Sequence, residues 1–180
     1  MRKYYLIILL AGLLTSSCTP VLSRNLISIG IFNDGLSEIK QAPDSYKGRL
    51  FIFGGIIVKT ETTKEGSLIE AIFVPVNSLG YLKSYTTSGG RFLALYKGRE
   101  ILDPLIFSQK REISLAGEFI EIRQGKIGEM DYDYPLFEIK EIHLWEEVKE
   151  RDYYYYYYMP PPAPYWYYRH GPYDPWWGYY

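Results

Sequence analysis

The chain has 180 residues, a formal net charge of −1 at pH 7, 18% aromatic residues and a single cysteine. The near-neutral charge argues against a nucleic-acid partner, which would require a basic surface, and one cysteine excludes an internal disulfide. We therefore expect a fold held by burial and backbone pairing, with enough chain for one domain and its appendages.

The first 17 residues have the three parts of an export signal. Met1-Arg2-Lys3 is basic, Tyr4–Leu14 is an apolar run of 11 residues, and Thr15-Ser16-Ser17 is a stretch of small residues. This order is typical of a secretory signal peptide. The apolar run is too short for a transmembrane helix, which needs about 20 residues. We predict that residues 1–17 are a signal peptide.

Cys18 follows directly, and Leu14-Thr15-Ser16-Ser17-Cys18 resembles the lipobox of bacterial lipoproteins, although Thr15 stands where the lipobox prefers leucine. The resemblance implies cleavage before Cys18, a diacylglyceryl group on its thiol and a fatty acyl chain on its new amino group. Two or more chains anchor a protein stably, whereas one holds it marginally. Thr19 stands where an aspartate would imply inner-membrane retention, so the resemblance favours the outer membrane. An ordinary signal peptide that ends near a free cysteine is the alternative.

Residues 18–45 are interpreted as a tether and an N-terminal arm. Pro20 and Asn33-Asp34-Gly35 favour turns. Leu36–Gln41 predicts one or two turns of helix, and Pro43 limits that helix because the residue before a proline avoids the α region.

Five strands are expected after the arm, because β-branched and aromatic residues become dense and apolar positions alternate. They are predicted at residues 49–59, 67–74, 91–96, 112–123 and 132–145. Gly54-Gly55 within the first strand predicts a bend or bulge. Lys64-Glu65-Gly66 and Gly125–Gly128 predict two hairpin turns. In the fourth strand the apolar alternation changes face after Gly117, which also predicts a bulge.

Strands that bend at glycines can serve two sheets and so remove exposed edges. We therefore predict an all-β domain over residues 46–147. Its expected architecture is a small barrel of five to six strands, similar to the oligonucleotide/oligosaccharide-binding (OB) barrel. A β-sandwich is the alternative, because these patterns do not distinguish closure from stacking.

Residues 148–180 differ in composition from the rest of the chain. Of the 20 tyrosines 12 lie after Arg151, as do 3 of the 4 tryptophans, and the segment also contains Met159-Pro-Pro-Pro-Ala-Pro164. High proline content and few aliphatic residues predict a disordered or extended low-complexity tail. Tyrosine and tryptophan favour membrane–water interfaces and stack on sugar rings. The tail is expected to be either a binding element or an inert sticky extension.

Few residues could carry chemistry. The two histidines, His143 and His170, lack partners at metal-ligand spacing. Glu129, Asp131 and Asp133 would share one strand face, but their spacing fits no defined calcium loop, so a solvated carboxylate edge is expected. No catalytic, metal-binding or cofactor-binding residue is predicted, and we expect that the protein is not an enzyme. A hydrolase with an unrecognised site is the remaining alternative.

Several short motifs, in order, resemble the Slp family of Gram-negative outer-membrane lipoproteins over residues 18–147. They follow Cys18 as Tyr46-x-Gly48, Phe53-Gly54-Gly55, Ser88-Gly89-Gly90-Arg91-Phe92, Leu102-Asp103-Pro104, Ser114-Leu115-Ala116-Gly117, Gly125-x-x-Gly128, Tyr132-x-Tyr134-Pro135 and Leu144-Trp145. Phe51 and Phe53 stand where the family usually carries Trp or Arg, and the tail is outside the shared pattern. The resemblance implies an outer-membrane lipoprotein with no assigned enzymatic activity.

These observations predict a non-enzymatic lipoprotein of the outer membrane, anchored through Cys18 on the periplasmic face. Its expected role is in envelope structure or protein assembly, with the membrane and other envelope proteins as partners. The alternative is a module that binds glycan or peptidoglycan through the barrel face and the aromatic tail.

Overall fold

The computed structural model describes residues 19–32, 35–83 and 89–146 of the chain. The predicted signal peptide, Cys18 and the predicted tail at residues 148–180 lie outside the described residues. Within the described residues no helix is long and apolar enough to cross a membrane.

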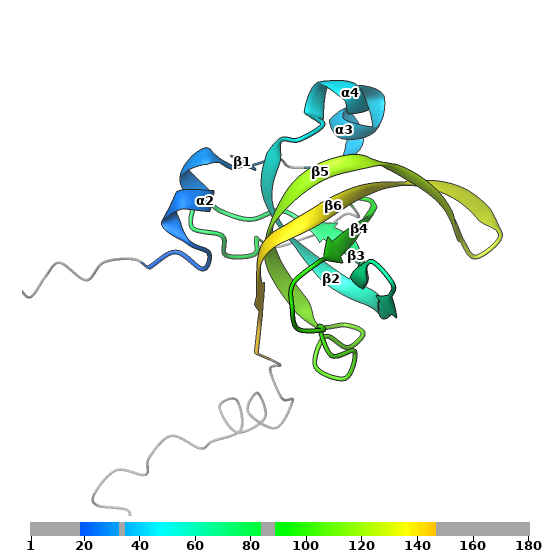
Figure 1. Ribbon diagram of the computed structural model, residues 1–180. Coiled ribbons are helices and arrows are strands. Elements are labelled where there is room, and N and C mark those ends of the chain that lie inside the picture. The colour runs from blue at the N-terminus through cyan, green and yellow to red at the C-terminus, as the bar shows by residue number, and fades with distance from the viewer. Residues whose placement is uncertain (1–18, 33–34, 84–88, 147–180) are drawn as a thin grey trace, which may run out of the picture. The chain divides into compact units, whose positions relative to one another are not determined.

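The domain is all-β, as predicted, and its main body is a closed barrel of five strands (Figure 1). The strands are β2 (Leu50–Thr63), β3 (Gly66–Val74), β4 (Arg91–Tyr96), β5 (Glu112–Ile127) and β6 (Met130–Leu144). Each pairs with the next in the order β2-β3-β4-β6-β5, and β5 pairs back with β2. The β4–β6 pair is parallel and the other four pairs are antiparallel. This is the predicted OB-like barrel rather than a sandwich.

Closure depends on β2, which has a different neighbour along each half of its length. Residues 50–56 pair with β5, and residues 54–63 pair with β3. Gly54 and Gly55 lie in the overlap, where β2 is paired on both sides. A Cβ atom at Gly55 would lie 2.8 Å from Cζ of Phe92, so the glycine leaves room for that ring in the barrel.

Six phenylalanines fill the interior of the barrel, and each is at most 2% exposed. They are Phe51, Phe53, Phe73, Phe92, Phe119 and Phe137. The ring of Phe137 lies at the centre of the group, with centroids 4.7 Å from Phe53, 5.6 Å from Phe119 and 5.8 Å from Phe51. Offset and edge-to-face aromatic pairs of this kind add to the free energy gained by burial. The interior is therefore a packed core.

Both ends of the barrel are covered. At one end the short helices α3 (Ser37–Gln41) and α4 (Pro43–Tyr46) add Leu36, Ile39 and Tyr46 to the core. At the other end the loop between β4 and β5 adds Leu102 and Phe107. Figure 1 shows α3 and α4 above the barrel and this loop below it.

The N-terminal arm lies against the outside of the barrel. It contains helix α2 (Arg24–Ile29), which was not predicted, and the two-residue strand β1 (Ile31–Phe32), which pairs in parallel with β2. Leu22, only 2% exposed, packs in a second, smaller core with Ile52, Val76 and Ala116. Ile52 of β2 and Ala116 of β5 are thus buried beneath the arm.

The structure moves one predicted bulge and confirms the other. The ladder runs through Gly54 and Gly55 without a shift, and the irregularity in β2 falls between Ile57 and Lys59. Between β5 and β6 the register shifts at Gly117, as predicted, where Lys140 of β6 is the extra residue. A second shift, which was not predicted, leaves Ile120 of β5 as an extra residue.

One predicted boundary was shifted and another was confirmed. The second hairpin turns at Gly128 and Glu129, because Ile127 pairs with Met130, so only Gly128 of the predicted turn Gly125–Gly128 lies in it. Helix α3 ends at Gln41, before Pro43, as predicted. Pro43 then begins a second helix, α4, where its missing N–H costs no hydrogen bond.

Replacing Phe137 by alanine should strongly destabilise the domain. Its ring is 0% exposed and contacts several other rings, so the substitution leaves a cavity. We expect the free energy of unfolding to fall by about 3–5 kcal/mol, measured by urea denaturation. Met130→Ala is the control, because Met130 is 76% exposed and its replacement should change stability by less than about 0.5 kcal/mol. Equal effects of the two substitutions would contradict the assigned core.

Candidate functional site

Since the interior is filled, the surfaces available for binding lie on the outside of the barrel. The outer face of β3, β4 and β6 is the part that the arm leaves uncovered. Cross-strand pairing places Glu70 beside Leu93, and Leu93 beside Leu136. By analogy with other OB barrels, whose equivalent face and flanking hairpins bind ligands, this face is the first candidate.

Three side chains from three strands form a hydrogen-bonded group on this face. Nη1 of Arg91 lies 2.7 Å from Oε1 of Glu70, and both side chains are less than one-third exposed. The hydroxyl of Tyr134 lies 3.1 Å from the same carboxylate oxygen and 3.2 Å from the carbonyl oxygen of Lys126, and it can donate to one of them. Burial, and then the hydrogen bond to Glu70, raise the pKa of Tyr134. The hydrogen bond to Glu70 raises the pKa of Arg91.

Tyr132 extends this group toward α3. Its hydroxyl accepts a hydrogen bond from the backbone N–H of Arg91 at 2.8 Å, and its ring lies edge-on to Tyr134 at 4.7 Å. Nζ of Lys40 sits 3.8 Å from the centroid of the Tyr132 ring, a cation–π contact. The two tyrosines therefore fix the base of the β5–β6 hairpin to the barrel and to α3.

A second polar group lies on the same face. The Glu138 carboxylate is 2.8 Å from Nζ of Lys97 and 2.8 Å from Nζ of Lys140, while Lys140 also lies 3.0 Å from Glu118. The hydrogen bonds from Lys140 and Lys97 lower the pKa of Glu138. Because the side chains of the two lysines are 50% and 34% exposed, solvent screens these ion pairs.

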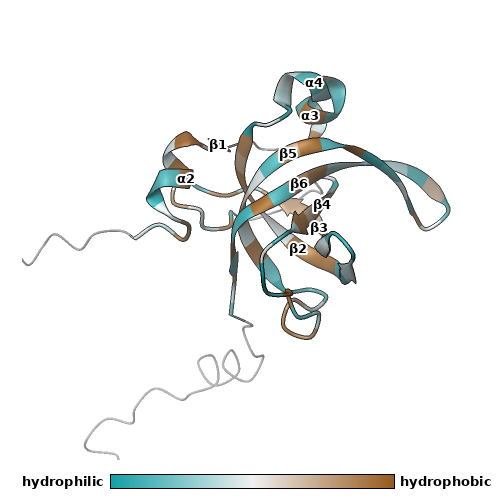
Figure 2. Ribbon diagram, viewed as in Figure 1, coloured by the Kyte–Doolittle hydropathy of each residue, from teal (hydrophilic) through white to brown (hydrophobic). Residues whose placement is uncertain are grey.

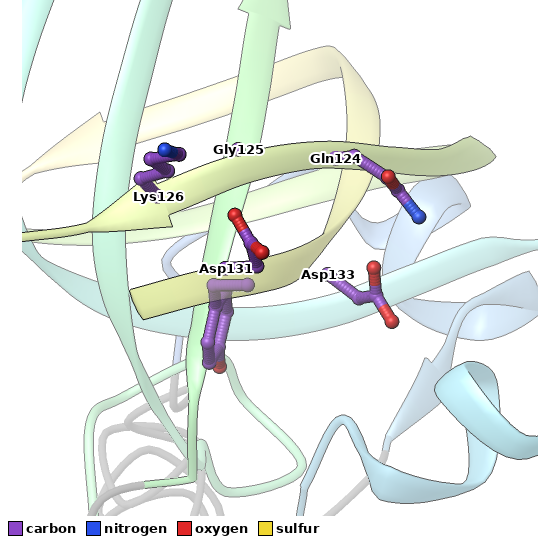
Figure 3. Close-up of a pocket in the computed structure, with 6 residues that line it drawn as sticks. Gln124, Gly125, Lys126, Asp131 and Asp133 are labelled. Atoms are coloured by element: carbon purple, nitrogen blue, oxygen red, sulfur yellow. The ribbon is translucent and has the colours of Figure 1, made fainter. Parts of the chain in front are cut away.

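The extended β5–β6 hairpin carries a polar pocket of about 540 Å³. It is lined by Gln124, Gly125, Lys126, Asp131, Tyr132 and Asp133. Figure 3 shows the side chains of Gln124 and Lys126 on one strand and those of Asp131 and Asp133 on the other. In the ladder Asp131 is paired with Lys126 and Asp133 with Gln124. The pocket thus offers carboxylate, ammonium, amide and phenol groups to a polar ligand.

The structure does not bring the acidic residues and histidines considered in the sequence analysis together at one site. Asp131 and Asp133 both line the hairpin pocket, whereas Glu129 lies in the turn. Within the described residues no three His, Cys, Asp or Glu side chains are close enough together to hold a metal ion. His143 stacks edge-on to Trp145 at 4.8 Å. Cys18 and His170 are outside the described residues.

The Glu70–Arg91–Tyr134 group was not predicted from the sequence. Its members lie 21 and 64 residues apart, on β3, β4 and β6. A sequence signal did exist: Glu70 interrupts an apolar strand, and a charged residue in such a strand needs either solvent or a partner. The identity of its partners depended on the β3–β4 pairing for Arg91 and on the β4–β6 pairing for Tyr134.

Comparison with known proteins identifies related sequences. The family model described as "Outer membrane lipoprotein Slp family" matches residues 15–177. An uncharacterised protein from Haemophilus influenzae is 29% identical over 102 residues, which cover 56% of this chain and 54% of that protein. The match therefore spans about half the length of this curated relative.

Two solved structures show weaker likeness. A protein assigned as an aspartyl-tRNA synthetase from Leishmania major has 11% identity and a TM-score of 0.34, over 61% of this chain and 20% of that one. The mitochondrial single-stranded DNA binding protein Rim1 from S. cerevisiae has 7% identity and a TM-score of 0.30, over 54% of this chain and 95% of that one. Both TM-scores are too low to establish a common fold.

The Glu138 ion pairs predict a pH-dependent contribution to stability. Because the folded-state pKa of Glu138 lies below its ordinary value of 4.5, the contribution is present above pH 4.5 and is lost as pH falls through the lowered pKa. Glu138→Gln should reduce the free energy of unfolding at pH 7 by no more than about 1 kcal/mol. At pH 3 the difference from the unaltered protein should shrink.

Urea denaturation at the two pH values measures this difference. Glu121→Gln is the control: its carboxylate is 51% exposed, and its nearest cation, in Arg123, is 3.6 Å away. A Glu138→Gln deficit that grew on acidification would contradict the assigned ion pairs.

Proposed function

The chain belongs to the outer membrane lipoprotein Slp family, and on that premise we propose that it is a non-enzymatic lipoprotein tethered through acylated Cys18. The tether holds a rigid OB-like barrel at the periplasmic face of the outer membrane. There the barrel contributes to envelope structure or to the assembly of other envelope proteins. Its outer β3–β4–β6 face is the surface offered to a partner.

The observation that carries this proposal is the docking of the arm immediately after residue 18. The N–H of Val21 donates to the carbonyl of Leu79 at 2.9 Å, and the N–H of Ser23 donates to the Glu141 carboxylate at 3.0–3.1 Å. Leu22, between them, is buried. A chain anchored at residue 18 would therefore hold the barrel directly at the bilayer, without a long flexible spacer.

The packed barrel supports a structural or binding role. Its core is filled by phenylalanine rings and covered at both ends, so the interior is occupied by the protein's own side chains. Ion pairs and tyrosine hydrogen bonds fix the outer face. A rigid surface of this kind suits recognition of a macromolecule, because little conformational entropy is lost on binding.

Cys18→Ala should release the protein from the membrane. We expect the unaltered protein to fractionate with the outer membrane and its mature N-terminus to show the mass of an acylated cysteine. The alanine variant should lack that mass and leave the outer-membrane fraction. Thr15→Leu is the matched control, because it moves the lipobox toward its preferred residue and should preserve acylation. Recovery of the unaltered chain with a free thiol would overturn the proposal.

Glycan binding is the second candidate, and the polar hairpin pocket favours it. Gln124, Lys126, Asp131 and Asp133 present hydrogen-bonding groups, and Tyr132 also lines the pocket. Protein sites for sugars combine such groups with aromatic rings. The aromatic residues after Arg151 would add stacking surface. Peptidoglycan is the ligand that this candidate favours.

If glycan binding is the function, purified peptidoglycan sacculi should retain the full-length protein. A chain ending at Asp152 tests the tail, and the double variant Lys126→Ala/Asp133→Ala tests the pocket. We expect each change to lower the retained fraction several-fold, whereas Met130→Ala, exposed beside the hairpin turn, should not change it. Equal and negligible retention of all four proteins would eliminate this candidate.

A further inference from the structure

The loop between β4 and β5 directs two aliphatic side chains outward. Leu105 is 86% exposed and Ile106 is 55% exposed, while Leu102 and Phe107, on either side of them, pack against the barrel core. Figure 2 shows the hydrophobic colour on this loop at the lower end of the barrel. The loop is therefore held at its base by two buried side chains and displays two others.

Hydrogen bonds fix the outward orientation. The carboxylate of Asp103 accepts the N–H of Leu105 at 2.8 Å, and its carbonyl accepts the N–H groups of Ile106 and Phe107 at 3.0 and 2.8 Å. These bonds define a tight turn with Leu105 and Ile106 at its outer side. Leu105 and Ile106 are therefore exposed because a hydrogen-bonded turn holds them outward.

A chain of contacts connects this loop to the first described residue of the arm. The guanidinium of Arg111 donates to the carbonyl oxygens of Ile106, at 3.4 Å, and Trp145, at 2.5 Å. The ring of Trp145 lies 5.5 Å from that of Tyr81. The hydroxyl of Tyr81 in turn donates to the carbonyl of Thr19 at 3.3 Å. Segments distant in sequence thus meet on one side of the barrel.

We propose that this side of the barrel contacts the phospholipid bilayer. The lipid-contact surface comprises Leu105, Ile106, Trp145, Tyr81 and Thr19. The inference rests on the acylation of Cys18 proposed above. Because consecutive Cα atoms are about 3.8 Å apart, the acylated residue must adjoin Thr19, and its fatty chains must enter the bilayer next to this surface.

The chemistry of the surface fits its place. Aliphatic side chains can enter the boundary between headgroups and acyl chains, and Trp and Tyr favour the headgroup level, where one end of the ring is apolar and the other polar. An exposed group of aliphatic side chains is unfavourable in water and indicates an interaction site. Because the acylated residue directly precedes Thr19, the bilayer is the apolar environment that this surface can contact at all times.

This placement also directs the opposite side of the barrel away from the membrane. Figure 1 shows the tip of the β5–β6 hairpin on the far side of the barrel from the arm and α2. The hairpin tip carries Met130, which is 76% exposed. Leu105 and Met130 are thus two apolar side chains of similar exposure on the barrel, and only the first lies on the lipid-contact surface.

Site-directed spin labelling of the full-length lipidated protein tests the proposal. Acylation occupies the thiol of the single native cysteine, so Leu105→Cys, Ile106→Cys and Met130→Cys each provide one labelling site. The labelled proteins are incorporated into vesicles of phosphatidylethanolamine and phosphatidylglycerol. Collision of the nitroxide with oxygen, which partitions into lipid, and with a water-soluble nickel chelate is then measured. Each label on the Cys18→Ala chain in buffer gives the water-exposed reference.

We expect nickel collision at residues 105 and 106 to fall several-fold in vesicles while oxygen collision rises. Residue 130 should stay at its reference value. Equal nickel collision at residues 105, 106 and 130 would overturn the proposal. A fall in both nickel and oxygen collision at residue 105 would also overturn it, because that result indicates burial against protein. Mass measurement of the N-terminus separates these outcomes from a failure of acylation, which would refute the tether itself.

Discussion

The structure depends on the packing of six phenylalanine rings inside a five-stranded barrel. Phe137 contacts rings from several strands, so the core forms only when the barrel is closed. Closure requires β2 to pair with β5 along its first half and with β3 along its second half. Where the two pairings overlap, Gly55 leaves room for the ring of Phe92. Because the rings occupy the interior, every surface that could recognise another molecule is on the outside.

The outside is divided by the N-terminal arm. The arm covers Ile52 of β2 and Ala116 of β5 with a small core around Leu22, and leaves the β3–β4–β6 face uncovered. That uncovered face is held by charged and phenolic groups whose partners come from different strands, as Arg91 and Tyr134 do with Glu70. The barrel thus has one side covered by the arm and another side whose charged and phenolic groups are held by hydrogen bonds.

Local sequence signals predicted the strands well, because β-branched and aromatic residues mark them and the Lys64-Glu65 turn joins two of them directly. They predicted the register shift at Gly117 but misplaced the bulge in β2 and missed the extra residue Ile120, since the register between paired strands is not encoded by a local pattern. Helix α2 was missed because its apolar residues Leu26 and Ile27 are partly buried against the barrel, a contact that depends on the tertiary fold. The Glu70–Arg91–Tyr134 group was missed because its members meet only when strands that are distant in the sequence pair with one another. The proposed lipid site, Cys18, came from the sequence alone.

The bond between Ser23 and Glu141 joins residues 118 positions apart. In a chain synthesised from its N-terminus, the N–H of Ser23 cannot meet the Glu141 carboxylate until nearly the whole domain has been made. The bond that joins the arm to β6 is therefore one of the last long-range contacts that can form during synthesis.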